Sequence, residues 1–332
     1  MKLGVRVNRN TLDNRGDDYL RFLQQIGVDC IDIELGLVAG YNETGCFSRE
    51  ALHALVARSA AFDLRIERAN AINSQHLDAL IGGPNAAEQR DHLCTMAELL
   101  GEVGVPVFGV QCYQAASAAT GGGTGRSHPE GRGGYRYYHF DLAAEEAAQG
   151  APRFTVTADQ LWENLLLTYK QVIPVAESAN INVAMHGNDP PLYELYGNPQ
   201  IMCRFADFDR LFSEVPSAHN TMTFCVGTRY ESGEDIFDGI RHFGGQGKIA
   251  HVHFRNVRGT LPANGSYSEV FLDEGDMHMQ RVVEALHGVN YQGAIDFDHV
   301  MQISGDTANG HQYVAYSVGY VRALLQGLGN AQ

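Results

Sequence analysis

The sequence predicts an α/β fold, a (β/α)8 TIM barrel in which residues 1–332 form a single domain. Two observations support this fold. Short apolar runs alternate with longer amphipathic stretches along the chain, as in repeated βα units. Eight such runs occur, and a barrel of about 250 residues leaves roughly 80 residues for loops and insertions.

The predicted strands are these eight runs. Each is short and mostly apolar, as expected for strands that are covered by helices on one face and by the barrel interior on the other. They lie at Leu3–Val7, Cys30–Glu34, Leu64–Glu67, Val107–Gln111, Ile181–Met185, Asn220–Phe224, Lys248–Val252 and Gly293–Phe297.

Capping residues mark the start of three predicted helices. Ser48 precedes the first. Thr157 is followed three residues later by Gln160, and Ser232 is followed at the same spacing by Asp235. This spacing lets the two side chains satisfy exposed amides of the first turn. Two of these helices carry an apolar face expected in the core: Leu161, Leu165, Tyr169 and Val172, and Ile236, Ile240 and Phe243.

The longest predicted insertion, residues 113–152, follows the fourth strand. It contains two glycine-rich runs, 121–125 and 131–134. Because long βα loops of a barrel often cover the active site, we expect a lid or a flexible spacer here. The glycine-rich runs lack the GxxxxGK[ST] pattern, so a phosphate-binding P-loop is not predicted.

The composition excludes several classes of protein. The chain has 24 Lys+Arg and 39 Asp+Glu, a net charge of −15, and no basic run, so nucleic acid is not an expected partner. No apolar stretch reaches the roughly 18 residues of a membrane helix, and the first residues enter a strand pattern instead of a signal peptide. We therefore expect a cytoplasmic protein whose six cysteines, which form no CxxC pair, are reduced.

Metal-ligand residue types stand at the carboxyl ends of four consecutive predicted strands, directly after the apolar run in each case. They are His186, Cys225, His253 and Asp298. The carboxyl ends of barrel strands meet at one mouth, so we expect these side chains to converge there and bind one divalent metal ion. For each residue alone, the alternative is a buried thiol or a hydrogen-bonded core side chain. His251 shares the face of His253 and is expected beside the ligands or in the core.

Five local sequences in the second half of the chain form a series: Met185–Pro191, Thr223–Thr228, His251–Arg258, Glu274–Met279 and Asp298-His299. In this order they resemble the HPDDPP, FC-x-G-[ST], H-[LF]-R-[NS], GD-x-DM and PDH segments of the mannonate dehydratase family. These are metal-dependent sugar-acid lyases built on a xylose-isomerase-like TIM barrel. The resemblance covers about residues 184–300, with a weaker match at Tyr316-Ser317.

The resemblance implies a site and a reaction. The family's metal ligands fall on the same four residues, and its proton-transfer residues fall on His299 and Tyr316. Arg255 and Asn256 are implied to face the substrate. The implied reaction converts D-mannonate to 2-keto-3-deoxy-D-gluconate with loss of water. It uses one divalent metal ion, for which Mn²⁺ is expected and Fe²⁺, Co²⁺ and Zn²⁺ are alternatives.

The sequence departs from the family pattern at three places. Gly187-Asn188 replaces Pro-Asp, His278 stands where Asp is usual, and Val300 replaces a Gly. We expect substrate contacts near Asn188 and His278 to differ from those of the family, so dehydration of another aldonate is an alternative activity.

A sugar acid is anionic, and a net charge of −15 provides no long-range attraction for it. Local arginines are therefore expected to hold it, because the guanidinium fork matches a carboxylate. The candidates are Arg255, Arg229, Arg126 and Arg132. A solvated surface position is the alternative for each.

Two other functions remain open at this point. A sugar isomerase or epimerase on the same barrel would rely on carboxylate and His ligands. The thiol of Cys225 argues against it, as does the missing array of Glu residues at the strand ends. A barrel that binds a sugar or a protein without catalysis is also compatible with the fold. A symmetric homo-oligomer is expected, as for many barrel enzymes.

Overall fold

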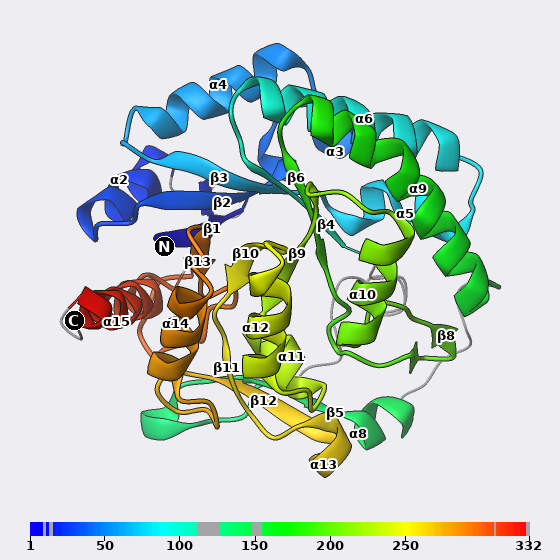
Figure 1. Ribbon diagram of the computed structural model, residues 1–332. Coiled ribbons are helices and arrows are strands. Elements are labelled where there is room, and N and C mark those ends of the chain that lie inside the picture. Colours follow the sequence, from blue (N-terminus) through cyan, green and yellow to red (C-terminus); the bar gives the residue numbers. More distant parts are fainter. Residues whose placement is uncertain (9–10, 13–15, 112–126, 148–154, 309, 330–332) are drawn as a thin grey trace.

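The structure is a computed structural model that describes residues 1–8, 11–12, 16–111, 127–147, 155–308 and 310–329. Eight strands close into a barrel, and the long helices pack around its outside (Figure 1). Every neighbouring pair of barrel strands is parallel. The predicted barrel fold is therefore confirmed.

The barrel strands follow one another in chain order, and the last pairs with the first. They are β1 (Lys2–Val7), β2 (Cys30–Glu34), β3 (Arg65–Asn70), β4 (Val107–Gln111), β6 (Asn182–His186), β9 (Asn220–Cys225), β10 (Ile249–His253) and β13 (Ala294–Asp296). All eight predicted runs are strands. β3 continues to Asn70 because Arg68, although charged, is fully buried and paired with Asp32 at 2.8 Å.

The helices separate these strands. They are α2 (Asp17–Gln25), α3 (Tyr41–Thr44), α4 (Arg49–Ala60), α5 (Leu77–Ile81), α6 (Ala86–Glu102), α8 (Leu142–Ala147), α9 (Ala158–Ser178), α10 (Phe205–Glu214), α11 (Val226–Glu231), α12 (Ile236–Gly245), α13 (Leu261–Asn264), α14 (Met279–Gly288) and α15 (His311–Gly329). The predicted caps of α4 and α9 are confirmed: Ser48 accepts from an amide of the first turn, and Thr157 forms a capping box with Gln160.

The prediction that Ser232 begins a helix is wrong. Ser232 lies at the end of α11, where its hydroxyl donates to a backbone carbonyl of that helix at 2.7 Å. Gly233 then adopts a φ of 79°, which ends the helical path. Asp235 is the capping residue, since its carboxylate accepts from two amides at the start of α12. Ser232 and Asp235 are both good caps, and the sequence spacing alone does not choose between them.

The described part of the 113–152 segment contains regular secondary structure: the short 3-10 helix η3 (Arg132–Gly134), the strand β5 (Tyr138–Asp141) and α8. β5 pairs with β12 (Ser266–Val270), which pairs with β11 (Asn256–Arg258). β11 begins three residues after the end of β10, so this small antiparallel sheet lies at the carboxyl end of the barrel (Figure 1). Residues 113–126 and 148–152, including Arg126, lie outside the described residues.

Two further observations concern the cysteines and the helices. Cys30, Cys46, Cys94, Cys203 and Cys225 are free thiols, and Cys112 lies outside the described residues. Within the described part of the chain, no helix combines the length and the apolar character that crossing a bilayer requires.

Candidate active site

The barrel brings the four predicted ligands together at its carboxyl end. His186, Cys225 and His253 are the last residues of β6, β9 and β10, and Asp298 follows β13 by two residues. One ligand atom from each side chain lies within 4.8 Å of those of the other three. Residues separated by more than 100 positions in the chain converge because neighbouring parallel strands end at one rim.

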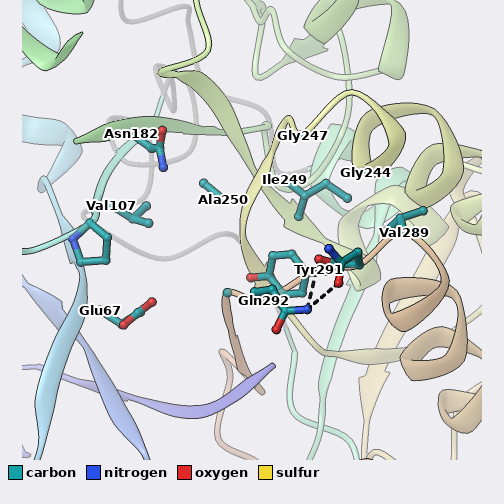
Figure 2. Close-up of a pocket in the computed structure, with 13 residues that line it drawn as sticks. Glu67, Val107, Asn182, Gly244, Gly247, Ile249, Ala250, Val289, Tyr291 and Gln292 are labelled. Carbon is teal, nitrogen blue, oxygen red and sulfur yellow. Dashed lines mark hydrogen bonds between the residues drawn. The ribbon is translucent and has the colours of Figure 1, made fainter. Parts of the chain in front are cut away.

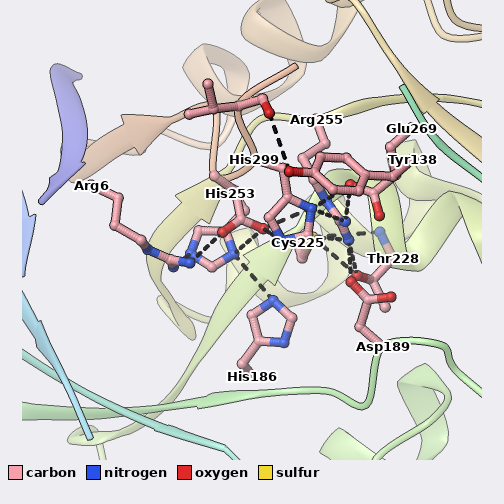
Figure 3. A network of polar contacts seen from close by, with 12 residues as sticks. Arg6, Tyr138, His186, Asp189, Cys225, Thr228, His253, Arg255, Glu269 and His299 are labelled. Carbon is pink, nitrogen blue, oxygen red and sulfur yellow. Dashed lines mark hydrogen bonds and ion pairs between the residues drawn. The ribbon is translucent and has the colours of Figure 1, made fainter. Parts of the chain in front are cut away.

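The two imidazoles contact each other inside this cluster. His186 Nε2 lies 3.1 Å from His253 Nδ1 (Figure 3). His186 Nδ1 donates to the carbonyl of Gly187 at 2.6 Å, so Nε2 is the acceptor nitrogen of the neutral ring. Burial lowers the pKa of His186 to about 3 and holds the pKa of His253 well below its usual value. Both rings are therefore neutral at pH 7, the form that binds metal.

Cys225 is surrounded by hydrogen-bond donors. The hydroxyl and amide of Thr228 approach its Sγ at 3.1 and 3.4 Å, and Arg255 Nη2 approaches at 3.2 Å. These donors suit a thiolate. Burial nevertheless raises the pKa of Cys225 to about 11, although Arg255 acts in the opposite direction. A metal ion would supply the additional positive charge that the thiolate form needs.

Asp298 lies in a tight turn after β13. Its φ is +60°, and its amide donates to the side chain of Asp296 at 2.9 Å. Its carboxylate pairs with Arg6 Nη1 at 2.5 Å. Burial alone would raise the pKa of Asp298, but the charges of His299, Arg6 and Arg255 outweigh burial and lower it. Asp298 is therefore an ionised carboxylate within the cluster.

A second group of possible ligands lies next to the first and shares His253 with it. It comprises Asp32, His251 and Asp296, with His251 Nε2 at 2.8 Å from the Asp296 carboxylate. Asp32 is paired with Arg68 at 2.8 Å and with Arg6 at 3.1 Å. Asp32 is held by two guanidinium groups and Asp296 by His251, so the side chains of this group are already engaged with one another and with Arg6 and Arg68.

A third acidic group surrounds Arg255. Its guanidinium pairs with Asp189 and with Glu269, each at 2.7 Å (Figure 3). It also pairs with Glu231 at 3.5 Å. All four side chains are buried. Three carboxylates around one arginine leave excess negative charge beside the His186–Cys225–His253–Asp298 cluster. That excess, with two neutral imidazoles and a thiol, fits a single divalent cation.

His299 lies at the edge of this network and is partly exposed. Its Nδ1 forms a short hydrogen bond with Glu269 and lies 3.0 Å from Arg255 Nη1. Its Nε2 is 3.5 Å from the Asp298 carboxylate. A carboxylate on Nδ1 holds the proton there, which leaves Nε2 as the nitrogen that can exchange a proton. The ring of Tyr138 lies 5.7 Å away on β5, a strand of the small antiparallel sheet of β11, β12 and β5, which we call the cover sheet.

Tyr316 lies in a different set of contacts. Its hydroxyl donates to Asp273 at 2.7 Å, and its ring stacks on Phe271 at 5.2 Å. Burial, the hydrogen bond and the charge of Asp273 raise its pKa. None of its contacts with other described residues reaches the four-ligand cluster. Arg132 pairs with the same Asp273 at 2.8 Å, away from that cluster.

The remaining predicted substrate-binding residues are committed to protein contacts. Asn256 donates to two carbonyls of the 272–277 segment, at 2.7 and 3.0 Å, and Asn188 donates to the carbonyl of Ile201. Arg229 donates to the carbonyl of Cys203 at 2.9 Å and packs on Phe208. These side chains fix the loops around the site, and their contact with a substrate stays a prediction.

Several polar residues of the site were missed in the sequence. Arg6, Asp32 and Arg68 occupy buried strands, and Asp189 and Glu269 hold Arg255. A signal was available for the first three, because a charged residue inside an apolar strand of a barrel must find a buried partner. No local signal pairs Glu269 with His299, since the two come together only through the cover sheet.

One pocket lies at the other end of the barrel. It has a volume of about 310 Å³ and is lined by the amino-terminal ends of several strands (Figure 2). Its lining includes Glu67, Asn182, Ile249 and Tyr291. Catalytic residues of such barrels sit at the carboxyl end, so this pocket is not part of the candidate active site.

The fold and the site define a class of protein: a TIM barrel with a buried His, Cys and Asp cluster that fits one divalent metal ion. Residues 151–332 match the model of the family described as D-mannonate dehydratase (UxuA). The chain belongs to this family.

Curated relatives have the same family name. Mannonate dehydratase 2 of Halalkalibacterium halodurans is 32% identical over 152 residues, which cover 46% of this chain and 44% of that protein. The mannonate dehydratase of Thermotoga petrophila is 33% identical over 156 residues, which cover 46% and 42%. The matched segment thus spans less than half the length of either relative.

Solved structures match the fold over the whole chain. The mannonate dehydratase from Streptococcus suis serotype 2 superposes with a TM-score of 0.85 at 24% identity, covering 100% of this chain and 94% of that one. A D-tagatose 3-epimerase-like protein superposes with a TM-score of 0.66 at 14% identity, covering 100% and 99%. At these identities the likeness concerns the fold.

Proposed function

We propose that this chain is a metal-dependent hydro-lyase that converts D-mannonate to 2-keto-3-deoxy-D-gluconate. One observation carries the proposal: His186, Cys225, His253 and Asp298 meet at the carboxyl end of the barrel, with His299 directly after the last of them. Membership of the D-mannonate dehydratase family supports the choice of reaction and of substrate.

In this proposal the four side chains hold one divalent ion, with Mn²⁺ as the expected metal. When bound, the ion would stabilise negative charge that develops on the carboxylate side of the substrate. The donor set also accepts Fe²⁺, Co²⁺ and Zn²⁺, so the choice among them depends on metal supply as well as on the ligands.

The protein's own residues would move the two protons of the dehydration. His299 exchanges a proton at Nε2, because Glu269 engages Nδ1. Tyr316, which is protonated at pH 7, is the second proposed proton-transfer group, and its hydroxyl would have to leave Asp273 to reach a substrate at the cluster. The cover sheet places Tyr138 beside His299 and would limit the access of water to the reacting carbons.

The direct test is an assay of product. Mn²⁺-loaded protein is incubated with D-mannonate, and the 2-keto-3-deoxy acid is followed by NMR. Formation of this acid supports the proposal. Activity on another aldonate alone would change the substrate but keep the reaction, and interconversion of sugars without loss of water would indicate an isomerase.

A matched pair of variants tests the role of His299. His299→Gln should lower kcat by at least about 100-fold with metal content unchanged, because general acid–base catalysis contributes about 10²–10⁴-fold. His242→Gln is the control, since His242 is an exposed residue paired with Asp209 on the outside of the barrel. Wild-type activity of His299→Gln would contradict the assignment.

We also infer a cytoplasmic location and a homo-oligomeric state. Free thiols at all five described cysteines favour a reducing compartment. Light scattering of the purified protein would measure the number of subunits.

A further inference from the structure

An anionic substrate needs a cation beside the metal site, and most arginines there are already neutralised. The side chains of Arg255, Arg229 and Arg68 are exposed by only 2%, 2% and 0%, and each is held by buried protein partners. A guanidinium enclosed in this way has little surface to offer a ligand.

Arg6 differs from them in exposure. Its side chain is 23% exposed, although it lies in β1 and contacts the site directly. Nε donates to Asp32 at 3.1 Å, and Nη1 pairs with Asp298 at 2.5 Å. Nη2 contacts His253 Nε2 at 2.8 Å (Figure 3). A guanidinium carries five N–H donors, so these contacts leave two of them for another acceptor.

The contact with Asp298 links Arg6 to the proposed metal ligands. Arg6 and a bound metal ion would both be attracted to the carboxylate of Asp298. When a cation shares that charge, the attraction between Arg6 and Asp298 weakens, and Arg6 gains capacity to bind a second carboxylate. The loading of the site would thus prepare Arg6 to receive an anionic ligand.

Space for the rest of a sugar acid lies beside the end of β1. Asn8, two residues after Arg6, lines a pocket of about 500 Å³ together with Thr11, Tyr138, Val300 and Gln302. The amide and hydroxyl groups that line this pocket can form hydrogen bonds with the hydroxyls of a sugar chain. Tyr138 also lies beside His299, so the pocket and the candidate active site have this residue as a common neighbour.

We propose that Arg6 binds the substrate carboxylate and so determines the specificity for sugar acids over neutral sugars. This assignment rests on the proposed function. It moves the carboxylate-binding role from Arg255 and Arg229, which the sequence favours, to an arginine of the first strand.

The test compares a sugar acid with its neutral amide. Binding of D-mannonate and of D-mannonamide is measured by calorimetry with Mn²⁺-loaded protein carrying His299→Gln, which suppresses turnover. Adding Arg6→Gln should raise the Kd for D-mannonate by about 10- to 100-fold, the range expected for a hydrogen bond to a charged group. The Kd for D-mannonamide should change by less than about threefold.

Two further variants complete the design. Arg58→Gln, which removes a surface arginine paired with Asp17, should change neither value. Arg6→Lys keeps the charge but loses the fork, and it should weaken D-mannonate binding to an intermediate degree. If Arg6→Gln does not fold, as judged by circular dichroism, Arg6→Lys provides the comparison.

Equal weakening of acid and amide would overturn the assignment and identify Arg6 as a residue that only positions Asp298 and His253. No weakening of either ligand would overturn it as well. If Mn²⁺-loaded protein without the His299→Gln substitution gives no 2-keto product from D-mannonate, yet D-mannonate binding depends on Arg6 and that of the amide does not, the proposed function fails and the role of Arg6 stands. Failure of any aldonate to bind would overturn both.

Discussion

At the scale of single residues, Cys225 decides the character of the candidate site. Its thiol is buried, surrounded by donors from Thr228 and Arg255, and placed beside two neutral imidazoles. A thiolate is a softer ligand than a carboxylate and distinguishes this site from an all-oxygen one. In the proposed site, the affinity for the metal would therefore depend on Cys225.

We expect Cys225→Ser to lose metal affinity and activity together while the barrel stays folded. A neutral hydroxyl replaces an anionic ligand, and the loss of Mn²⁺ affinity should exceed about 100-fold, the upper end of the effect of residues that merely orient ligands. Metal titration, circular dichroism and the product assay measure the three quantities. Cys94→Ser, at a half-buried thiol of α6, is the control and should behave like the wild type. Wild-type affinity in Cys225→Ser would show that the ligand assignment is wrong.

Metal binding should release one proton near neutral pH. The Cys225 thiol has a pKa of about 11 and is protonated, whereas His186 is neutral and Asp298 is ionised before the metal arrives. The ion must displace the thiol proton, so the apparent affinity should rise about tenfold per pH unit between roughly pH 6.5 and 8.5. Calorimetry in buffers of different ionisation enthalpy counts the protons released. A pH-independent affinity would indicate that the thiol is not a ligand.

At the scale of elements, the helices that brace the barrel depend on local capping, independently of the site. α9 starts with the capping box of Thr157 and Gln160 and buries its apolar face, including Leu161, Leu165 and Tyr169. Its packing against the barrel beside β6 supports the strand that ends at His186.

Thr157→Ala should lower the free energy of unfolding by about 1 kcal/mol, because it leaves an amide of the first turn of α9 without its side-chain acceptor. Urea denaturation measures the change. Ser178→Ala is the matched control: Ser178 lies at the exposed carboxyl end of the same helix and bonds back to Pro174, so the change should stay within about 0.5 kcal/mol. Metal affinity should be unchanged in both variants, because the cap of α9 affects stability and not the metal ligands. A loss of metal affinity of more than tenfold in Thr157→Ala would contradict this expectation.

The cover sheet of β11, β12 and β5 is the element that joins the 113–152 segment to the site. Phe140 on β5 stacks on Tyr267 of β12 at 5.3 Å, and the Tyr267 hydroxyl donates to Asp189 at 3.0 Å. Glu269 on β12 bonds to His299. The sheet therefore supplies polar partners to the active site in addition to covering it.

At the scale of the whole molecule, the proposed metal site would join separate parts of the barrel. Its ligands come from β6, β9, β10 and the end of β13, so an ion bound there links strands across more than 100 residues of chain. Such a site exists in the folded state only, and metal binding should stabilise the entire fold.

Removal of the metal should lower Tm. At a free Mn²⁺ concentration of about 100 times Kd, binding contributes about 2.7 kcal/mol, which corresponds to roughly 4 °C in Tm for a chain of 332 residues. A thermal scan before and after chelation measures the shift. Cys225→Ser should respond much less, and an equal response of this variant would place the stabilising metal at another site.

The sequence was sufficient for the barrel and for the choice of proposed ligands. The alternation of apolar runs is visible locally, and strand ends mark the positions that face the mouth, so the order of residues alone selects His186, Cys225, His253 and Asp298. The helix start at Ser232 was mispredicted because two good caps lie three residues apart and only the φ of Gly233 distinguishes them.

The sequence by itself determined the repeating βα pattern and the residue types at the strand ends, because both follow from periodicity along the chain. Only the tertiary structure decided how the charges pair. It enclosed Arg255 among Asp189, Glu231 and Glu269, directed Arg229 toward α10, and left Arg6 partly exposed beside Asp298. The physical reason is that ion pairing depends on the distance between residues remote in sequence and on the burial of each, and a local sequence pattern specifies neither.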